Sequence, residues 1–258
     1  MSLIRASRSG TGPPMVLVHG LGARRESWQP MLAGLSAVRE VVAVDLPGHG
    51  ETPPLQGPLT FDRLVEDLHE YLTEQDLTEA HLVGSSMGAR MVLELARRGV
   101  GRHVVALDPG GFWNDTEKAV FGASVKASFV LVKALRPALP ALAGSPVGRT
   151  ALLPQFTPRP WAVPADVAVP ELQSIADTAA LYETLAALVE SGPQLGGPTP
   201  GRVVLGWGRR DRVTLARQAS RAAAAFPQAT VHWFERCGHF PMWDQPDEAV
   251  RVVLAATD

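Results

Sequence analysis

In the stretch Gly84-Ser85-Ser86-Met87-Gly88, a glycine stands two residues before and two residues after a serine. The stretch follows a short apolar run, Ala80-His81-Leu82-Val83, and opens a helical pattern that continues to Arg98. Between a strand and a helix, G-x-S-x-G places the serine on a strained turn and exposes its hydroxyl, and the glycines let neighbouring backbone pass close by. We therefore predict that Ser86 is an exposed nucleophile at the end of a buried strand.

Short valine-rich runs alternate with helical patterns along the chain. The runs are apolar throughout, which is typical of strands buried on both faces of a parallel sheet. They are Met15–Val18, Val41–Asp45, Ala80–Gly84, Val104–Asp108, Val203–Trp207 and Thr230–Phe234. The helical patterns are Ser27–Val38, Phe61–Glu74, Met87–Arg98, Leu215–Phe226 and Asp247–Ala256. Repeated βαβ units predict an α/β fold with a mostly parallel, doubly wound sheet.

Residues 113–200 break this alternation, because they contain no strand pattern and hold half of the chain's 22 prolines. Helical patterns cover Ala119–Leu135 and Glu171–Ser191, on either side of a Pro/Gly-rich passage that ends at Pro170. A segment of this length is too long for a loop inside a compact domain. We expect residues 1–112 and 201–258 to form the core domain, and residues 113–200 a helical cap, or lid, over one edge of the sheet.

Composition excludes several classes of protein. The chain has 258 residues, of which 46% are apolar, and a net charge of −2. This is enough apolar material for one core, and there is no basic field to attract nucleic acid or anionic lipid. No window approaches the ~20 apolar residues of a membrane helix, and the N-terminus lacks the apolar region of a signal peptide. Cys237 is the only cysteine, so no intrachain disulfide forms. We expect a cytoplasmic monomer or homodimer that acts on a small molecule.

Three polar residues follow strands of the predicted sheet, at the edge where open α/β sheets build their sites. A serine is a poor nucleophile unless a base takes its proton, and His239, after the last strand, is the best candidate for that base. The histidine in turn needs a carboxylate to fix its tautomer. Asp211, just past the preceding strand, is our choice, and Asp108, at the end of the strand Val104–Asp108, is the alternative.

Acyl transfer also needs hydrogen-bond donors for the developing oxyanion, each worth roughly 2.7–4 kcal/mol. The backbone N–H of Met87, at the start of its helix, is one candidate. The second is the N–H of Leu21, since the glycines of His19-Gly20-Leu21-Gly22 allow this peptide to point inward.

On these motifs, together with Val16–Gly20 and Asp45–Gly50, the chain resembles the α/β-hydrolase fold superfamily. The resembling group is that of capped single-domain serine hydrolases: esterases, carbon–carbon bond hydrolases and cofactor-free haloperoxidases. By this resemblance Ser86, Asp211 and His239 match the catalytic triad, and Leu21 and Met87 match the oxyanion-hole donors. The loop Asp45–Gly50 resembles a structural loop, so His49 is not a second base.

The resemblance also bears on the sheet. Met15–Val18 resembles the third strand of the family's eight, and the residues before it leave room for one strand around Leu3–Ala6. The first edge strand of the family is therefore expected to be absent. In the family's numbering the cap is inserted after the sixth strand.

The expected activity is hydrolysis of a small to medium carboxylic ester through an acyl-enzyme. Resembling epoxide hydrolases and haloalkane dehalogenases carry aspartate at the nucleophile position, so Ser86 argues against both. No metal or cofactor is expected, because there is one cysteine and no H-E-x-x-H motif. The predicted pocket residues are Trp28, Trp113, Phe121, Val125, Phe129 and Phe240.

Three alternatives stay open. A carbon–carbon hydrolase acting on a vinylogous diketone would share the Ser-Met-Gly turn, and Arg90 would meet a substrate carboxylate. A cofactor-free haloperoxidase or perhydrolase would use the same serine with peroxide and acetate. A ligand receptor on a hydrolase scaffold would keep the triad without turnover.

Overall fold

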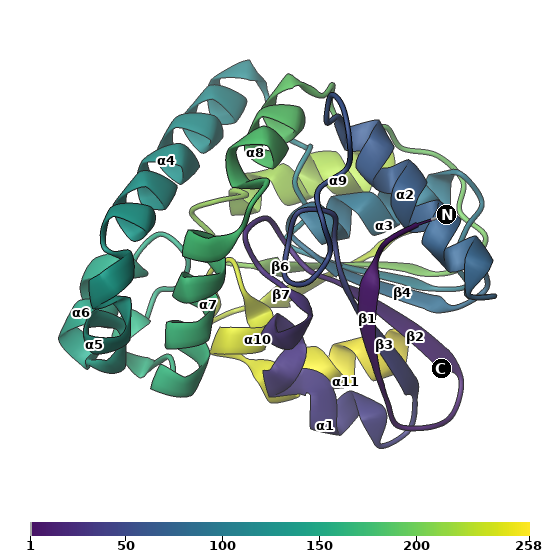
Figure 1. Cartoon of the computed structure of the whole chain (residues 1–258). Coiled ribbons are helices and arrows are strands. Elements are labelled where there is room, and N and C mark those ends of the chain that lie inside the picture. Colours follow the sequence, from purple (N-terminus) through teal and green to yellow (C-terminus); the bar gives the residue numbers. More distant parts are fainter. Residues whose placement is uncertain (1) are drawn as a thin grey trace.

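A seven-stranded sheet forms the centre of the molecule (Figure 1). The structure is a computed structural model and describes residues 2–258. The strands are β1 (Arg5–Ser9), β2 (Pro14–Val18), β3 (Glu40–Asp45), β4 (His81–Ser85), β5 (Val104–Leu107), β6 (Val203–Gly208) and β7 (Thr230–Phe234). Their order is β1-β3-β2-β4-β5-β6-β7. The mostly parallel α/β sheet predicted from the valine-rich runs is confirmed.

β1 is the exception to the parallel arrangement, because it pairs antiparallel with β3, from Arg5 opposite Asp45 to Ser9 opposite Val41. The remaining neighbours pair in parallel. Within residues 2–258, β1 is the one strand before β2, in agreement with the single strand expected there. Counted along this chain, the helical insertion therefore follows the fifth strand, β5.

Helices cover both faces of the sheet, and β2 shows how its residues divide between the faces. Met15 and Leu17 join a core cluster that also contains residues of α1 and α11. Val16 and Val18 join a second cluster with residues of α2, α3 and α9. This alternation is the period of two expected of a strand. The helices of this part are α1 (Gln29–Ser36), α2 (Phe61–Glu74), α3 (Met87–Arg97), α9 (Ala219–Ala225), α10 (Pro241–Asp244) and α11 (Pro246–Ala256), with the 3₁₀ turns η1 (Arg25–Trp28) and η4 (Ala216–Gln218).

Residues 113–200, here called the inserted segment, are helical and lie to one side of the sheet (Figure 1). Their helices are α4 (Asp115–Ala134), α5 (Leu139–Gly144), α6 (Pro146–Leu152), α7 (Ala165–Asp177) and α8 (Leu181–Glu190), with the 3₁₀ turns η2 (Arg136–Ala138) and η3 (Pro160–Ala162). The Pro/Gly-rich passage is more helical than its composition suggests, because prolines occupy the first turns of α5 and α6. Proline is tolerated there, where its missing N–H costs no helical bond.

The single helix predicted over Glu171–Ser191 is wrong. Thr178 leaves the helical conformation (φ −58°, ψ 120°), which separates α7 from α8. The break brings Ala180 onto the 45–50 loop, where its N–H donates to the Gly48 carbonyl at 3.3 Å. Among the helices of residues 2–258, none combines the length and apolar character needed to cross a membrane.

Candidate active site

Ser86 occupies the sharp turn between β4 and α3. Its backbone is in a rarely populated conformation, φ 54° and ψ −112°, which for a residue with a side chain stores strain. Two glycines make the turn possible. A Cβ at Gly88 would lie 2.1 Å from the Val18 carbonyl oxygen, and one at Gly84 would lie 2.3 Å from the Gly88 carbonyl oxygen. The structure therefore places Ser86 on the strained strand–turn–helix connection that the sequence predicts.

His239 and Asp211 form a buried hydrogen-bonded pair. His239 Nδ1 lies 2.8 Å from Asp211 Oδ2. The carboxylate also accepts hydrogen bonds from the Val213 N–H at 2.7 Å and from the N–H and hydroxyl of Thr214 at 3.1 and 2.7 Å. These donors fix the carboxylate, so that Nδ1–H of the histidine donates to it and Nε2 is left as an acceptor.

Asp108, the alternative acid, lies behind this pair. Its Oδ1 accepts a hydrogen bond from the Gly208 N–H at 2.8 Å, while among the described residues its buried Oδ2 has no hydrogen-bond partner. Burial, with Asp211 beside it, raises the pKa of Asp108 well above its usual value. The geometry thus pairs Asp211, and not Asp108, with the His239 ring.

Asp108, Asp211 and His239 also offer ligand atoms within 4.8 Å of one another, as a metal site would. A cation there would compete with the hydrogen bond between His239 and Asp211. The arrangement is better explained by that bond.

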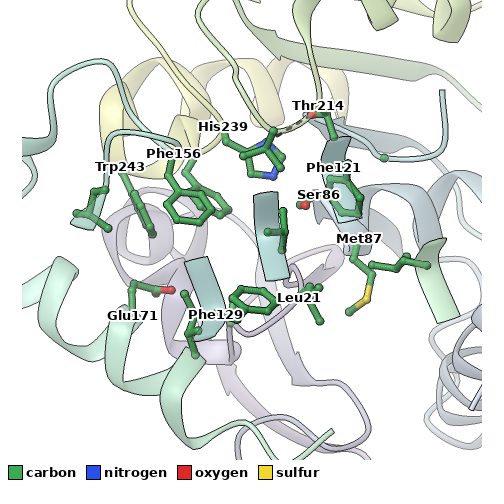
Figure 2. Close-up of a pocket in the computed structure, with 18 of the residues that line it drawn as sticks. Leu21, Ser86, Met87, Phe121, Phe129, Phe156, Glu171, Thr214, His239 and Trp243 are labelled. Carbon is green, nitrogen blue, oxygen red and sulfur yellow. Dashed lines mark hydrogen bonds between the residues drawn. The ribbon is translucent and has the colours of Figure 1, made fainter. Parts of the chain in front are cut away.

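A cavity brings Ser86 and His239 together (Figure 2). It has a volume of about 710 Å³ including its mouth, and most of its walls are apolar. Five of the predicted pocket residues line it: Trp113, Phe121, Val125, Phe129 and Phe240. Trp28 does not, which corrects the prediction. It packs in the core with Met15 and Met31 and borders a separate, smaller cavity. The reason is its place at the end of η1, which packs against β2 and β3 of the sheet.

Leu21 and Met87 also line the cavity. The turn before Leu21 lies against the serine, since a Cβ at Gly20 would be 3.1 Å from Ser86 Cβ. Among residues 2–258, neither the Leu21 nor the Met87 N–H donates to a protein acceptor. Neither amide is therefore engaged within the described part of the protein, as the predicted oxyanion hole requires.

His19 holds this turn in place. Its Nε2 accepts a hydrogen bond from the Leu46 N–H at 3.0 Å, and its Nδ1 lies 2.7 Å from the Gly20 carbonyl oxygen. Burial lowers the pKa of His19 to about 4, so the ring is neutral, as an acceptor at Nε2 requires. The His49 ring lies beside it at a tilt of 48°, with ring centroids 5.2 Å apart, and His49 does not line the cavity.

Arg90 points away from the cavity and joins the inserted segment to the core. It donates to the Ser191 hydroxyl at 2.8 Å and the Gly192 carbonyl at 2.6 Å, and its guanidinium lies 4.1 Å from the centroid of the Phe61 ring. The suggested contact between Arg90 and a substrate carboxylate is therefore wrong for this arrangement.

The inserted segment also holds the loop that carries His239. The His239 N–H donates to the Phe156 carbonyl at 2.7 Å. The Thr157 hydroxyl donates to Asp244 Oδ1 at 2.6 Å, and Asp244 Oδ2 accepts a hydrogen bond from the Gly238 N–H at 2.8 Å. The position of the imidazole thus depends on residues of the inserted segment.

Glu171, on α7, is a residue of the cavity that the sequence analysis missed. A signal was present in the sequence. Ala168, Leu172 and Ile175 are spaced as one face of a helix, and Glu171 occupies a position of that same apolar face. Burial raises the pKa of Glu171 to about 7, although the Ser27 hydroxyl and Arg24 act in the opposite direction.

Comparisons with known proteins agree with this architecture. Residues 15–252 match the family model described as "Alpha/beta hydrolase family". An uncharacterized protein of Mycobacterium tuberculosis is 27% identical over 95% of this chain and 75% of its own length. The enol-lactonase of Burkholderia xenovorans superposes with a TM-score of 0.77 at 19% identity, covering 98% of this chain and 96% of its own. A meta-cleavage product hydrolase of Pseudomonas fluorescens superposes with a TM-score of 0.75 at 20% identity, covering 98% and 93%. The chain belongs to the alpha/beta hydrolase family.

Proposed function

We propose that the protein is a serine hydrolase that cleaves a small to medium carboxylic ester. One observation carries the proposal: Ser86 on its strained turn and His239, hydrogen-bonded to Asp211 at 2.8 Å, line the same largely apolar cavity. A serine, a base and a group that orients the base are what nucleophilic acyl transfer requires.

The proposed reaction has two steps. His239 Nε2 takes the Ser86 proton as the serine oxygen attacks the ester carbonyl, and the N–H groups of Leu21 and Met87 hold the oxyanion. The leaving alcohol departs with the proton from His239. Water, activated by the same histidine, then releases the acid and restores Ser86. Asp211 stabilises the imidazolium in both steps.

The lining of the cavity disfavours a substrate that carries a carboxylate. The described lining residues include no lysine or arginine, and Glu171 is their only carboxylate. Recognition of a carboxylate ordinarily uses a cationic partner such as arginine. An ester therefore fits this cavity better than the carboxylate-bearing diketone of the carbon–carbon alternative. The similar solved structures include both kinds of enzyme, so likeness alone does not choose between them.

We also propose that the inserted segment acts as a cap. Phe121, Val125 and Phe129 of α4 and Leu172 and Ile175 of α7 face the cavity that holds Ser86. Without these helices that side of the cavity would be open to water.

The test is a panel of p-nitrophenyl esters from C2 to C12, assayed beside a dienoic ring-fission product and, with peroxide and acetate, for perhydrolysis. We expect hydrolysis of at least one ester at a kcat/KM several orders of magnitude above that for the ring-fission product. Ser86→Ala should remove it. Ser85→Ala is a matched control, because the Ser85 hydroxyl is buried and has no hydrogen-bond partner among the described residues.

A fluorophosphonate adduct mapped by mass spectrometry should lie on Ser86. Labelling of another serine, or ester turnover that survives Ser86→Ala, would contradict the proposal. Preferred turnover of the ring-fission product would support the carbon–carbon alternative instead. Tight ligand binding with no turnover of any compound would point to the receptor.

A further inference from the structure

A carboxyl group lies in the cavity at a distance from the candidate catalytic residues. Figure 2 shows Glu171 at the opposite end of the cavity from Ser86, with its carboxyl directed inward. The side chain is on α7, and only 8% of the residue is exposed. Its surroundings in the cavity are apolar and include Phe129, Leu172 and Trp243.

Other buried glutamates in this chain have cationic partners, and Glu171 differs from them. Hydrogen bonds from Arg97 and Arg98 hold Glu94 and, against the effect of burial, lower its pKa to about 2. Glu117 likewise contacts two arginine side chains. Within residues 2–258, no Lys, Arg or His nitrogen lies within salt-bridge distance of Glu171.

The groups that face Glu171 from the neighbouring loop do not neutralise it. They are Arg24, Glu26 and the hydroxyl of Ser27. Arg24 is already paired with Glu26, at 3.3 Å, and both side chains are more than one third exposed. The Glu171 carboxyl therefore has polar neighbours on the side of residues 24–27. Its oxygens can still accept a hydrogen bond from a group in the cavity.

We propose that Glu171 is a specificity-determining residue, which accepts a hydrogen bond from a hydroxyl or protonated amine at the far end of an otherwise apolar ester substrate. The inference rests on the proposed ester hydrolysis, because it places the ester group at Ser86. A substrate that ends in a carboxylate is disfavoured, because it would bring two negative charges together in an apolar cavity.

A hydrogen-bond donor on the substrate should be preferred, because a carboxylate without a cationic partner is unfavourable in an apolar cavity. A hydrogen bond to a charged group contributes more than one between neutral groups, and in binding it gives about a 10- to 100-fold preference. A pKa of about 7 supports the role, because the carboxylate is then populated near neutral pH and a bound donor would populate it further.

The experiment measures binding to Ser86→Ala protein by titration calorimetry, so that turnover is not needed. The ligands are ethyl esters of C4 to C10 acids that end in methyl, hydroxyl, methoxy, ammonium or carboxylate, with a second series that carries these groups on the alcohol. We expect, at one chain length, binding 10- to 100-fold tighter for hydroxyl or ammonium than for methyl and methoxy, and the weakest binding for carboxylate.

Variants in the same Ser86→Ala background separate the two donors. Glu171→Leu should abolish the preference for both. Glu171→Gln should keep much of the preference for hydroxyl and lose that for ammonium, because its amide oxygen accepts but carries no charge. Glu26→Gln is the matched control: it removes a neighbouring charge from outside the cavity and should leave the preference in place.

Equal binding of methyl- and hydroxyl-terminated ligands at every length, or a preference that survives Glu171→Leu, would overturn the inference. So would the absence of binding by all ligands. If Glu171→Leu does not fold, Glu171→Gln and the ligand series in the parent protein still decide. An absence of ester turnover by the wild-type protein would instead overturn the proposed function, whatever the binding series shows.

Discussion

The carboxyl of Glu171 leads to a prediction about the stability of the protein that does not depend on any substrate. Glu171→Gln should make the protein more resistant to unfolding above neutral pH, and the gain should vanish in acid. The ordinary pKa of a glutamate is 4.5, and burial raises that of Glu171 to about 7 in the folded protein. Below pH 4.5 both states hold the proton. As the pH rises from 4.5 to about 7, the unfolded chain releases it first, so stability falls.

The magnitude follows from this interval. Each pH unit between the two pKa values is worth about 1.4 kcal/mol. By pH 8 the ionised carboxyl therefore costs the folded state about 3 kcal/mol, and glutamine removes this cost. In a chain of this length that corresponds to a rise in Tm of about 6–12 °C.

The assay is thermal or urea unfolding of wild type and Glu171→Gln from pH 4.5 to pH 8.5. The difference between the two proteins isolates Glu171, because Asp108 and the other titrating groups contribute equally to both. Glu26→Gln, at the outer side of the same carboxyl, should show little of this pH dependence. A difference between Glu171→Gln and wild type that stays constant across the range would refute the assignment of a raised pKa to Glu171.

Three further predictions concern the two candidate acids and two contacts between the inserted segment and the core. Asp211→Asn should lower kcat roughly 10⁴-fold, because the histidine loses its tautomer partner. Asp108→Asn should change kcat less than about 10-fold, because Asp108 accepts a hydrogen bond from the Gly208 N–H and not from the His239 ring. Steady-state ester hydrolysis compares the two variants, and equal losses would contradict the pairing. Thr157→Val should remove the hydrogen bond to Asp244 and destabilise the protein by about 1 kcal/mol. In ester hydrolysis its kcat should fall by a larger factor than its KM rises. If kcat and the pH–rate profile stay unchanged, this contact does not position the base. Arg90→Met should lower the free energy of unfolding in urea by about 2 kcal/mol and leave ester turnover unchanged. A loss of activity in folded Arg90→Met protein would instead indicate that Arg90 contacts the substrate.

Strongly periodic segments of the fold could be predicted to the residue. Phe61–Glu74 has the predicted bounds, because its apolar residues recur at the helical period. The short valine-rich strand Thr230–Phe234 also has the predicted bounds. The single helix predicted over Glu171–Ser191 failed, because Thr178 leaves the helical conformation and Ala180 then contacts Gly48, far away in the sequence. No local pattern carries such a contact.

In the candidate site, too, local sequence signals predicted some residues, whereas others depend on contacts between distant parts of the chain. The glycine spacing around Ser86 is a local signal of its turn. The choice between Asp211 and Asp108 is not local, since each follows a neighbouring strand and only the folded sheet shows which carboxylate meets His239. Trp28 was misplaced for a related reason: it is near a site loop in sequence but packs into the core.

The backbone link from Phe156 to His239 constrains how any molecule can reach the serine. A hinged opening that lifted all five inserted helices together would break the hydrogen bond from the His239 N–H to the Phe156 carbonyl and displace the proposed base. An entry route that keeps the proposed base in place therefore leaves residues 156–157 fixed. A replacement of the inserted segment has the same restriction, because a graft without these two residues would remove the contacts of Phe156 and Thr157 with the His239 loop and its neighbour Asp244.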